Sequence, residues 1–485
     1  MKSVRLALIS SLAGNYISVA LQLLSTVIIA RLLTPTEIGI YAVAAVLAQL
    51  AAQFRDFGMA EYLIQEKELT NQKIRAAFGV NIVVSWSMAV IFFFASWVVA
   101  DFYNEPGIGI VMRIQSVNFL LVSFGGVTQA YFRREMMYRP VFVTGLLAGI
   151  TSTFLAIGLA LAGFGYLSLA WASLAGLVVT IAVSIAYRPK DFPKWPSLKG
   201  AREVISFSKH AMGIYFFGQI GKGAPEAVIG KVLDMASVAF FSRANGLMEL
   251  LYRTVLRAIL PVCLPYFAQE ARAGNKSVHG YLKATTLITG VGWPFFLFVG
   301  LMAFSAIRMI YGPQWSQSVQ LAQILCIMAI IELPYWLATE VMIAAGRIDQ
   351  SNRLQFLVQG TRLLGVLFVI PFGLVGACWG LVASALFGAI ISHTYLRKII
   401  DLQFRDVVAA CKPSIGVALL SATPAILVHI FSEQSESTYI WLLIGCGIAT
   451  GLSWLVALKV MNHPLWSEIL NVTSTLTARF RPKEQ

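Results

Sequence analysis

The feature that most constrains the fold of this sequence is a series of long apolar stretches separated by short polar connections. Each stretch is long enough for a helix to cross the hydrocarbon core of a bilayer, which takes about 20 residues. Charged residues make up only 12% of the 485 residues, and the mean hydropathy is +0.74. A soluble protein needs about 25% charged residues to cover its surface. The sequence therefore excludes a cytosolic enzyme and predicts an all-α integral membrane protein.

Fourteen stretches of membrane length can be placed along the chain. They are residues 9–30, 38–54, 77–99, 108–131, 141–161, 166–187, 211–229, 238–260, 287–307, 319–344, 354–372, 375–395, 414–430 and 439–460. The first follows a short basic N-terminus and continues without a convincing cleavage site, so we expect it to be retained as a span.

The distribution of Lys and Arg predicts the orientation in the membrane. With the N-terminus inside, 28 of the 37 Lys and Arg residues fall in cytoplasmic segments, four fall outside and five lie within spans. Positive residues are retained preferentially on the cytoplasmic side, so we expect both termini in the cytoplasm. The net charge of +14 thus reflects topology and contact with the inner leaflet, and does not indicate a nucleic-acid partner.

A weak internal repeat has an offset of 200 residues. Residues 27–53 align with residues 227–253, although only five of these 27 positions are identical. The offset superposes the first two spans on the seventh and eighth, which predicts two parallel six-helix lobes plus two C-terminal helices, a transporter architecture. The expected parts are an N-terminal lobe (1–190), a cytoplasmic linker (191–204), a C-terminal lobe (205–400), spans thirteen and fourteen (401–461) and a basic cytoplasmic tail (462–485). The tail is either an amphipathic segment on the anionic inner leaflet or a frayed end.

The connection after the first span carries a helix-start signature. Thr34, Pro35, Thr36 and Glu37 form a capping box with proline at the first helical position. This pattern predicts a tight turn into the second span and no chemistry.

Polar side chains within the predicted spans are the candidate substrate contacts, because unpaired polarity in hydrocarbon is costly. The first span carries Asn15 and Gln22 on one polar face, and its repeat partner, the seventh span, carries Lys222 and Glu226. Glycines and a proline near Lys222 predict a kink or break there. Broken helices often line substrate cavities.

The eighth span is the most charged. At 100° per residue its charged side chains lie within an arc of about 120°. They are Arg243, Glu249, Arg253 and Arg257. The repeat counterparts of Glu249 and Arg253 in the second span are the neutral amides Gln49 and Gln53, so the second lobe is the charged one.

Arg362 in the eleventh span and Glu332 in the tenth are further candidates, and Arg362 lies near the middle of its span. A structural interpretation competes: Glu249 can pair with Arg253 at i,i+4, while Arg113 and Arg308 can extend from helix ends to the membrane surface. For Arg253 and Arg362 we favour a water-filled cavity, since deep arginines need a partner or water.

Signatures of an enzyme, a metal or a cofactor are missing from the sequence. There is no P-loop and no pair of aspartates at D-x-D spacing, and the five histidines and five cysteines are dispersed. The predicted outer connections are short and hold few carboxylates. The sequence thus predicts neither a catalytic centre nor a metal site.

With its fourteen predicted spans, its six-plus-six repeat and the stretch from Ala30 to Tyr41, the chain resembles the polysaccharide transporters. These are the Wzx-type flippases of the multidrug/oligosaccharidyl-lipid/polysaccharide exporter superfamily. Residues 56–60 and 63–65 are also similar to the branch that serves exopolysaccharides such as colanic acid and succinoglycan. The motifs are confined to the first seventy residues and mark a family rather than a substrate.

The resemblance implies a bacterial inner-membrane protein that moves undecaprenyl-pyrophosphate-linked oligosaccharide units to the periplasmic leaflet as two lobes rock around a cavity. Anionic head groups would suit the cationic side chains. The expected substrate contacts are Arg253, Arg257, Arg362, Arg243, Lys222, Gln49, Gln53, Asn15 and Gln22. For the superfamily a proton or sodium gradient is the expected driving force, with Glu249, Glu226 and Glu332 as candidate carriers. A polymerase and a co-polymerase of the same pathway are possible partners.

Three alternatives remain open from the sequence. A multidrug exporter of the same fold would bind organic cations and favour acidic residues in its cavity, whereas this chain is richer in arginine. A lipid II flippase of the same superfamily is the next alternative. A polysaccharide polymerase or ligase would need carboxylates on a substantial outer loop.

Overall fold

The computed structural model describes residues 17, 20–56, 59–193, 195–273, 277–431 and 439–471. The chain forms two compact units, Met1–Ala239 and Phe240–Gln485, and the division lies within a helix. Within the described residues every regular element is helical. The division into six-span lobes at residues 191–204 stays a prediction.

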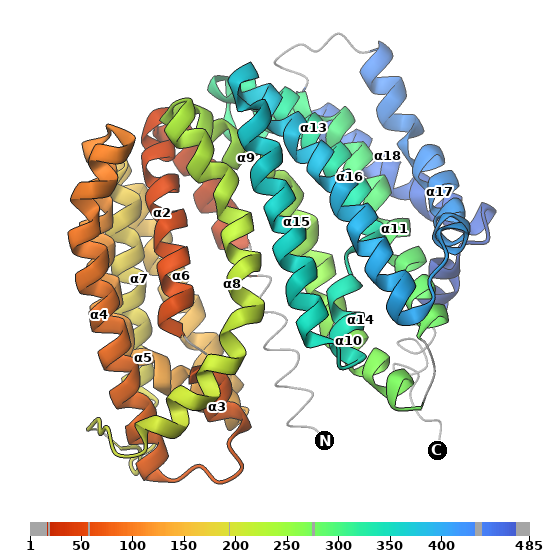
Figure 1. Cartoon of the computed structure of the whole chain (residues 1–485). Helices are drawn as coiled ribbons and strands as arrows, with labels where there is room; N and C mark the ends of the chain where they lie inside the picture. The colour runs from red at the N-terminus through yellow and green to blue at the C-terminus, as the bar shows by residue number, and fades with distance from the viewer. Residues whose placement is uncertain are drawn as a thin grey trace, which may run out of the picture. The chain divides into compact units, whose positions relative to one another are not determined.

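The first unit is a bundle of mostly long, roughly aligned helices (Figure 1). The long helices are α2 (Pro35–Asp56), α4 (Asn71–Tyr103), α5 (Pro106–Arg134), α6 (Tyr138–Leu161), α7 (Leu167–Ala186) and α8 (Ala201–Val232). Two shorter helices, Ala20–Leu32 and α3 (Met59–Gln65), belong to the same unit. α4 packs against α5 and α6 against α7, while α2 contacts α5 and α8.

The capping box at the start of α2 is confirmed. The backbone N–H of Thr34 donates to Glu37 Oε2 at 2.8 Å, and the N–H of Glu37 donates to Thr34 Oγ1 at 3.3 Å. The same corner recurs 200 residues later, where α8 ends and α9 (Met235–Leu251) begins. There the N–H of Ser237 donates to Asp234 Oδ1 at 2.7 Å. The weak sequence repeat therefore corresponds to a repeated structural corner.

The second unit continues from α9 through a π-helical turn, η1 (Tyr252–Leu256), into α10 (Arg257–Arg272). The remaining helices are α11 (Val278–Leu301), α12 (Ala303–Tyr311), α13 (Gln317–Glu332), α14 (Ala338–Ala344), α15 (Ile348–Val369), α16 (Gly373–Ile400), α17 (Phe404–Phe431) and α18 (Tyr439–Val460). α15 and α16 approach so closely that a Cβ on Gly380 would lie 2.1 Å from the carbonyl oxygen of Gly365. α11 packs against α17, and α17 against α18.

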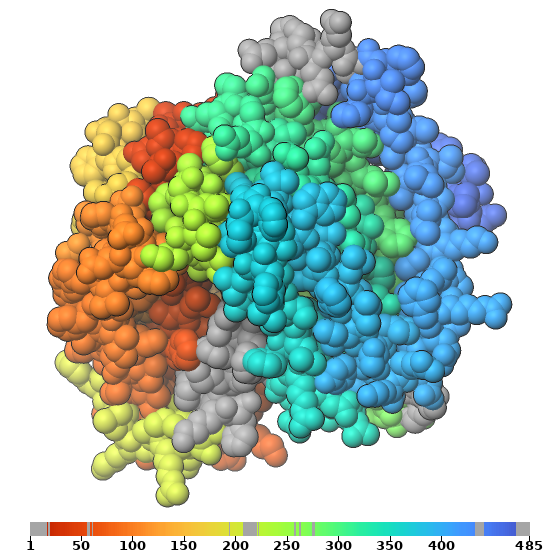
Figure 2. Space-filling model, turned by 45° about the horizontal axis from the view of Figure 1, so that its top comes forward, coloured from red at the N-terminus to blue at the C-terminus, as the bar shows by residue number. Residues whose placement is uncertain are grey.

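Ten helical segments among the described residues have the length and apolar composition of a membrane span. One of them, Ile348–Ile400, contains α15 and α16, so these segments account for eleven of the fourteen predicted spans. The first predicted span is described only in part, and the seventh and eighth are helical but more polar. Large apolar side chains lie exposed along the segments, as on α15 and α16, whose surface Figure 2 shows in cyan to light blue. These features describe an all-α, multi-pass membrane protein.

The predicted continuous span 319–344 is broken in the structure. α13 ends at Glu332, a 3₁₀ turn, η3 (Leu333–Tyr335), follows, and α14 resumes at Ala338. Pro334 lacks an N–H, so the carbonyl of Ile330, four residues earlier, loses its helical partner. The indole N–H of Trp293 donates to this carbonyl at 3.0 Å. A side chain of α11 thus supplies the hydrogen bond that the proline removes, as helix breaks in a membrane require.

A second proline in the same unit is accommodated in the same way. Pro294 lies inside α11, and the carbonyl that it leaves without a helical partner is that of Gly290. The indole N–H of Trp454, on α18, donates to this carbonyl at 2.8 Å. α11 therefore continues as a single helix through its proline.

Candidate functional site

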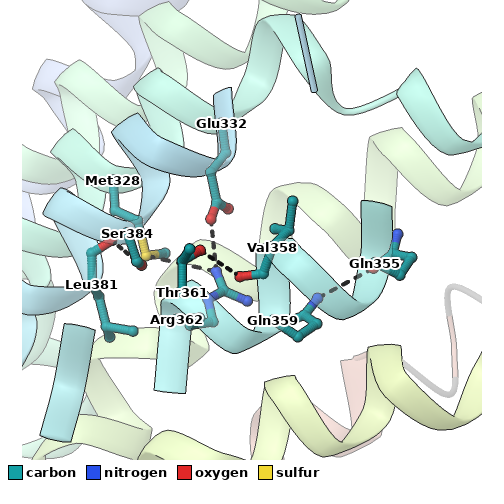
Figure 3. A network of polar contacts seen from close by, with 9 residues as sticks. All are labelled: Met328, Glu332, Gln355, Val358, Gln359, Thr361, Arg362, Leu381 and Ser384. Atoms are coloured by element: carbon teal, nitrogen blue, oxygen red, sulfur yellow. Dashed lines mark hydrogen bonds and ion pairs between the residues drawn. The ribbon is translucent and has the colours of Figure 1, made fainter. Parts of the chain in front are cut away.

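An ion pair joins two helices inside the second unit. Arg362 Nη2, on α15, lies 2.8 Å from Glu332 Oε1, at the end of α13 (Figure 3). The two side chains are 18% and 27% exposed, so the pair is largely removed from the surface. Glu332 occupies the last position of α13, immediately before the break at Pro334, and Met328, one turn earlier, also contacts the guanidinium. The break in α13 thus presents a carboxylate to the arginine of α15.

A second carboxylate–arginine pair lies where α9 gives way to the π-helical turn. Arg253 Nε is 3.3 Å from Glu249 Oε2, and the two side chains are 41% and 36% exposed. This i,i+4 contact is the structural interpretation that the sequence left open. Arg253 lies within η1, and π-turns of this kind frequently occur at functional sites.

Tyr252 lies near both pairs. It directly precedes Arg253, and its hydroxyl is close enough to Glu332, Arg362 and Glu249 for their charges to act on it. Its ring also lies 6.4 Å from the ring of Trp336, just after η3. We refer to Tyr252, Glu249, Arg253, Glu332 and Arg362 as the Tyr252 cluster. This cluster gathers residues from α9, η1, α13 and α15.

Polar side chains continue from the cluster along α15. Gln359 Nε2 donates to Gln355 Oε1 at 3.3 Å, and Gln355 Nε2 donates to Thr339 Oγ1 at 2.8 Å. Figure 3 shows Gln355, Gln359 and Arg362 following one another along the same helix. Each amide can both donate and accept, so this row can exchange its internal bonds for bonds to a hydroxylated ligand.

The two other candidate arginines of the eighth span are not part of the Tyr252 cluster. The guanidinium of Arg243, on α9, lies over the rings of Tyr311 and Trp315, with centroid distances of 5.4 and 5.3 Å. Cation–π contacts of this kind stabilise packing. Arg257 begins α10, and its side chain lies outside the described part of the chain.

The remaining predicted contacts belong to the first unit. Gln49 is exposed and Gln53 is half-buried on α2, Gln22 is exposed on the helix Ala20–Leu32, and Glu226 is half-buried on α8. Lys222 also lies on α8. The side chain of Lys222 and the whole of Asn15 are outside the described residues.

Two arginines that the sequence assigned about equally to structure and function have structural contacts. Arg113 Nε donates to the carbonyl of Gly109 at 3.1 Å, and its guanidinium lies 5.1 Å from the ring centre of Trp97. Arg308 Nε donates to Ser316 Oγ at 3.2 Å. These contacts favour the structural interpretation for both.

Sequence reasoning missed Tyr252 and Trp336. Neither carries a charge, and aromatic residues in spans are usually packing residues. The available signal for Tyr252 was its position between Glu249 and Arg253 on the most charged predicted span. Trp336 had no signal, because its place depends on the break after Glu332.

The Tyr252 cluster can exchange the ionic partners of its arginines. Its two carboxylates balance its two arginines, so an incoming anion can compete for a guanidinium, and a proton can neutralise a carboxylate and release its arginine. Among the described residues no group of three His, Cys, Asp or Glu side chains could hold a metal ion.

Comparison with known proteins gives matches over most of the chain. A model of the family described as "Polysaccharide biosynthesis protein" matches residues 28–320. The succinoglycan biosynthesis transport protein ExoT of Rhizobium meliloti (strain 1021) is 25% identical over 61% of this chain and 60% of its own length. The match therefore spans less than two thirds of that relative. The lipopolysaccharide biosynthesis protein WzxC of Escherichia coli (strain K12) is 20% identical over 80% of each chain.

Solved structures share the fold. The lipid II flippase MurJ in an inward closed conformation superposes with a TM-score of 0.75, at 12% identity, over 93% of this chain and 98% of its own. An inward-facing transporter of the multidrug resistance MATE family gives 0.60, at 14% identity, over 83% of this chain and 99% of its own. At these identities the likeness concerns the fold alone.

Proposed function

Since the chain belongs to the polysaccharide biosynthesis protein family, we propose that it is a flippase that moves undecaprenyl-pyrophosphate-linked oligosaccharide repeat units from the cytoplasmic to the periplasmic leaflet. The names of the relatives support transport in the assembly of exopolysaccharide or lipopolysaccharide. The fold is shared with MurJ, a lipid II flippase, so it is a fold that a flippase can have. The activity is transport and not catalysis of a covalent step.

The observation that carries this proposal is the Tyr252 cluster. Two guanidiniums lie beside carboxylates among membrane helices, and a row of amides continues from one of them. The pyrophosphate of the substrate would displace Glu332 and Glu249 from Arg362 and Arg253, because guanidinium binds phosphate with two parallel hydrogen bonds. The amides of Gln355 and Gln359 would then meet hydroxyls of the oligosaccharide.

The carboxylates of the two pairs are the proposed carriers of a proton or sodium gradient. Glu332 or Glu249 would take up the ion on the periplasmic side and release it to the cytoplasm, so that the ion moves down its gradient while the substrate moves outward. Glu226 is a third candidate carrier. The two six-span lobes would alternate their opening around this site, as parallel repeats do in transporters.

The remaining predicted contacts complete the proposal. Arg243 and Arg257 would contribute positive charge from the second lobe. Lys222, Asn15, Gln22, Gln49 and Gln53 would line the path from the first lobe. The protein would reside in the bacterial inner membrane with both termini in the cytoplasm, and would deliver its product to a polymerase and co-polymerase.

The test is export of polymer by a strain that lacks its own flippase of this class. We expect the wild-type gene to restore export, and Arg362→Ala and Arg253→Ala to reduce it at least tenfold at equal membrane abundance, since a charged hydrogen bond contributes about 1.5–3 kcal/mol. Arg308→Ala is the matched control, because this arginine does not belong to the Tyr252 cluster and donates to Ser316. Wild-type export by both Ala variants would contradict the site.

The same-fold alternatives are separated by a second assay. A lipid II flippase would restore growth to cells depleted of their own lipid II flippase, and a multidrug exporter would raise resistance to organic cations. We expect neither result. Either one, without polymer export, would replace the proposed substrate.

A further inference from the structure

A small cavity with a cationic lining opens between the start of α15 and the end of α16. Its volume is about 370 Å³, and its lining consists of Arg347, Gln350, Arg353, Tyr395, Lys398 and Ile399. Three of these six side chains are cations and none is acidic. Arg362 lies more than two helical turns beyond Arg353, so this cavity is separate from the Tyr252 cluster.

The charge of this cavity suits a phosphate. Arg347, Arg353 and Lys398 are exposed, and three like charges around one cavity repel one another unless an anion lies between them. Arg347 also precedes the first turn of α15, whose N-terminus adds partial positive charge. Asp349 belongs to the same turn but does not line the cavity. The half-buried Tyr395 hydroxyl and Gln350 amide add neutral donors.

The surface next to the cavity is apolar and suits acyl chains. On α15, Phe356 and Leu357 follow Arg353 by three and four residues, which places them on the same helix face, and they are 58% and 41% exposed. On α16, Ile390 lies eight residues before Lys398 and is 63% exposed. The surface of both helices is visible in Figure 2. Cations at the ends of these helices thus adjoin side chains that a membrane would cover.

We propose that this cavity binds the phosphate-bearing head group of an anionic membrane phospholipid, with the acyl chains lying along the exposed apolar side chains of α15 and α16. Basic pockets between membrane helices bind such head groups on the cytoplasmic side, where the charge distribution of this sequence places this end of both helices. A lipid held here would tie the ends of α15 and α16 to the inner leaflet. The proposal does not depend on which substrate the protein carries.

The test measures lipid binding to the purified full-length protein. Native mass spectrometry of protein titrated with phosphatidylglycerol or with phosphatidylethanolamine gives the affinity for each. We expect wild-type protein to prefer phosphatidylglycerol, and the triple variant Arg347→Gln/Arg353→Gln/Lys398→Gln to bind it about 100-fold more weakly, since each cation near the membrane surface contributes about fivefold. The variant Arg347→Lys/Arg353→Lys retains the charge and should bind within a fewfold of wild type.

Arg397→Gln is the matched control, because this exposed arginine adjoins Lys398 but does not line the cavity. It should leave the preference unchanged. Equal affinity of wild type and triple variant for phosphatidylglycerol would overturn the proposal. If the triple variant does not fold, Lys398→Gln alone should bind about fivefold more weakly, and an unchanged affinity would overturn the proposal equally.

A polyprenyl pyrophosphate offers the same phosphate chemistry and is the third titrant. Wild-type protein could bind polyprenyl pyrophosphate more tightly than phosphatidylglycerol, with this binding abolished in the triple variant. That result would make the cavity a substrate site and contradict the assignment to a phospholipid. If protein that does not export polymer still binds phosphatidylglycerol more tightly than phosphatidylethanolamine, the assignment is supported independently of the proposed function.

Discussion

Glu332 and Arg362 show at the scale of single residues why a charge inside a membrane protein needs its partner. Their pair is mostly hidden from the surface, because the side chain of Arg362 is 18% exposed and that of Glu332 is 27% exposed. Removing one partner of a hidden pair leaves an uncompensated charge, whereas removing both does not. The stability of the variants therefore reports the pairing directly.

We expect Glu332→Gln to lower the free energy of unfolding by about 2 kcal/mol, between the values for exposed and fully buried pairs. The double variant Glu332→Gln/Arg362→Gln should be more stable than this single variant. Denaturant titration in detergent measures both. Glu249→Gln, in the more exposed pair with Arg253, is the control and should cost about 0.5 kcal/mol. Additive effects of the two substitutions at 332 and 362 would contradict the pairing.

His463 provides a pH-dependent residue outside the spans. It is 1% exposed, its Nδ1 accepts the N–H of Leu465 at 3.1 Å, and its Nε2 lies 3.1 Å from Ser414 Oγ. With Nδ1 as an acceptor, the ring is neutral and Nε2–H donates to the hydroxyl. Burial accordingly lowers the pKa of His463 below its usual 6.5.

The unfolded chain therefore binds a proton at a higher pH than the folded chain does. The stability that neutral His463 contributes is complete above about pH 6.5 and falls as the pH drops from there toward the lower folded pKa. We expect the unfolding temperature of the wild type to fall between pH 7.5 and pH 5.5 by more than that of His463→Gln. An equal fall in both proteins would show that this histidine does not titrate on unfolding.

Helix breaks belong to the scale of elements, and they depend on neighbouring helices. Trp293→Phe removes the indole N–H that satisfies the Ile330 carbonyl beside Pro334. We expect a loss of about 1–2 kcal/mol, the cost of a buried acceptor without its donor. Adding Pro334→Ala should recover part of this loss, because an alanine N–H can donate to the same carbonyl. Chemical unfolding of both variants checks this, with exposed Trp441→Phe as the control. No recovery in the double variant would contradict the role of the indole.

The sequence predicted the capping box at Thr34 and Glu37, and it offered the contact between Glu249 and Arg253 as the alternative to a water-filled cavity. Both features join residues three or four positions apart, so a single segment contains both partners. The pair of Glu332 and Arg362 spans 30 residues, and no periodicity in either helix brings them together. The break after Glu332 was missed because a proline alone does not distinguish a kinked helix from a broken one.

At the scale of the whole molecule, orientation is the prediction that charge counting makes most sharply. Ala162 and Asp191 are exposed and lie in the connections before and after α7. Since α7 crosses the membrane once, these two positions must lie on opposite sides of it. The distribution of Lys and Arg places Asp191 in the cytoplasm.

In a Cys263→Ser background, we expect Ala162→Cys to react with a membrane-impermeant maleimide in cells with a permeable outer membrane. Asp191→Cys should react only after lysis. The four other cysteines are buried and supply the unlabelled background. The opposite pattern would invert the topology and place the cationic cavity of α15 and α16 on the outer side.

The indole of Trp454 and the ring of Pro294 lie on different helices, yet the Gly290 carbonyl makes each depend on the other. The indole N–H of Trp454 has this acceptor only while proline leaves the carbonyl without a helical partner, and proline is tolerated only while an indole or another donor replaces its N–H. Among related sequences, positions 294 and 454 should therefore change together. Such covariation would reveal a hydrogen bond between two helices that the sequence of either helix alone does not indicate.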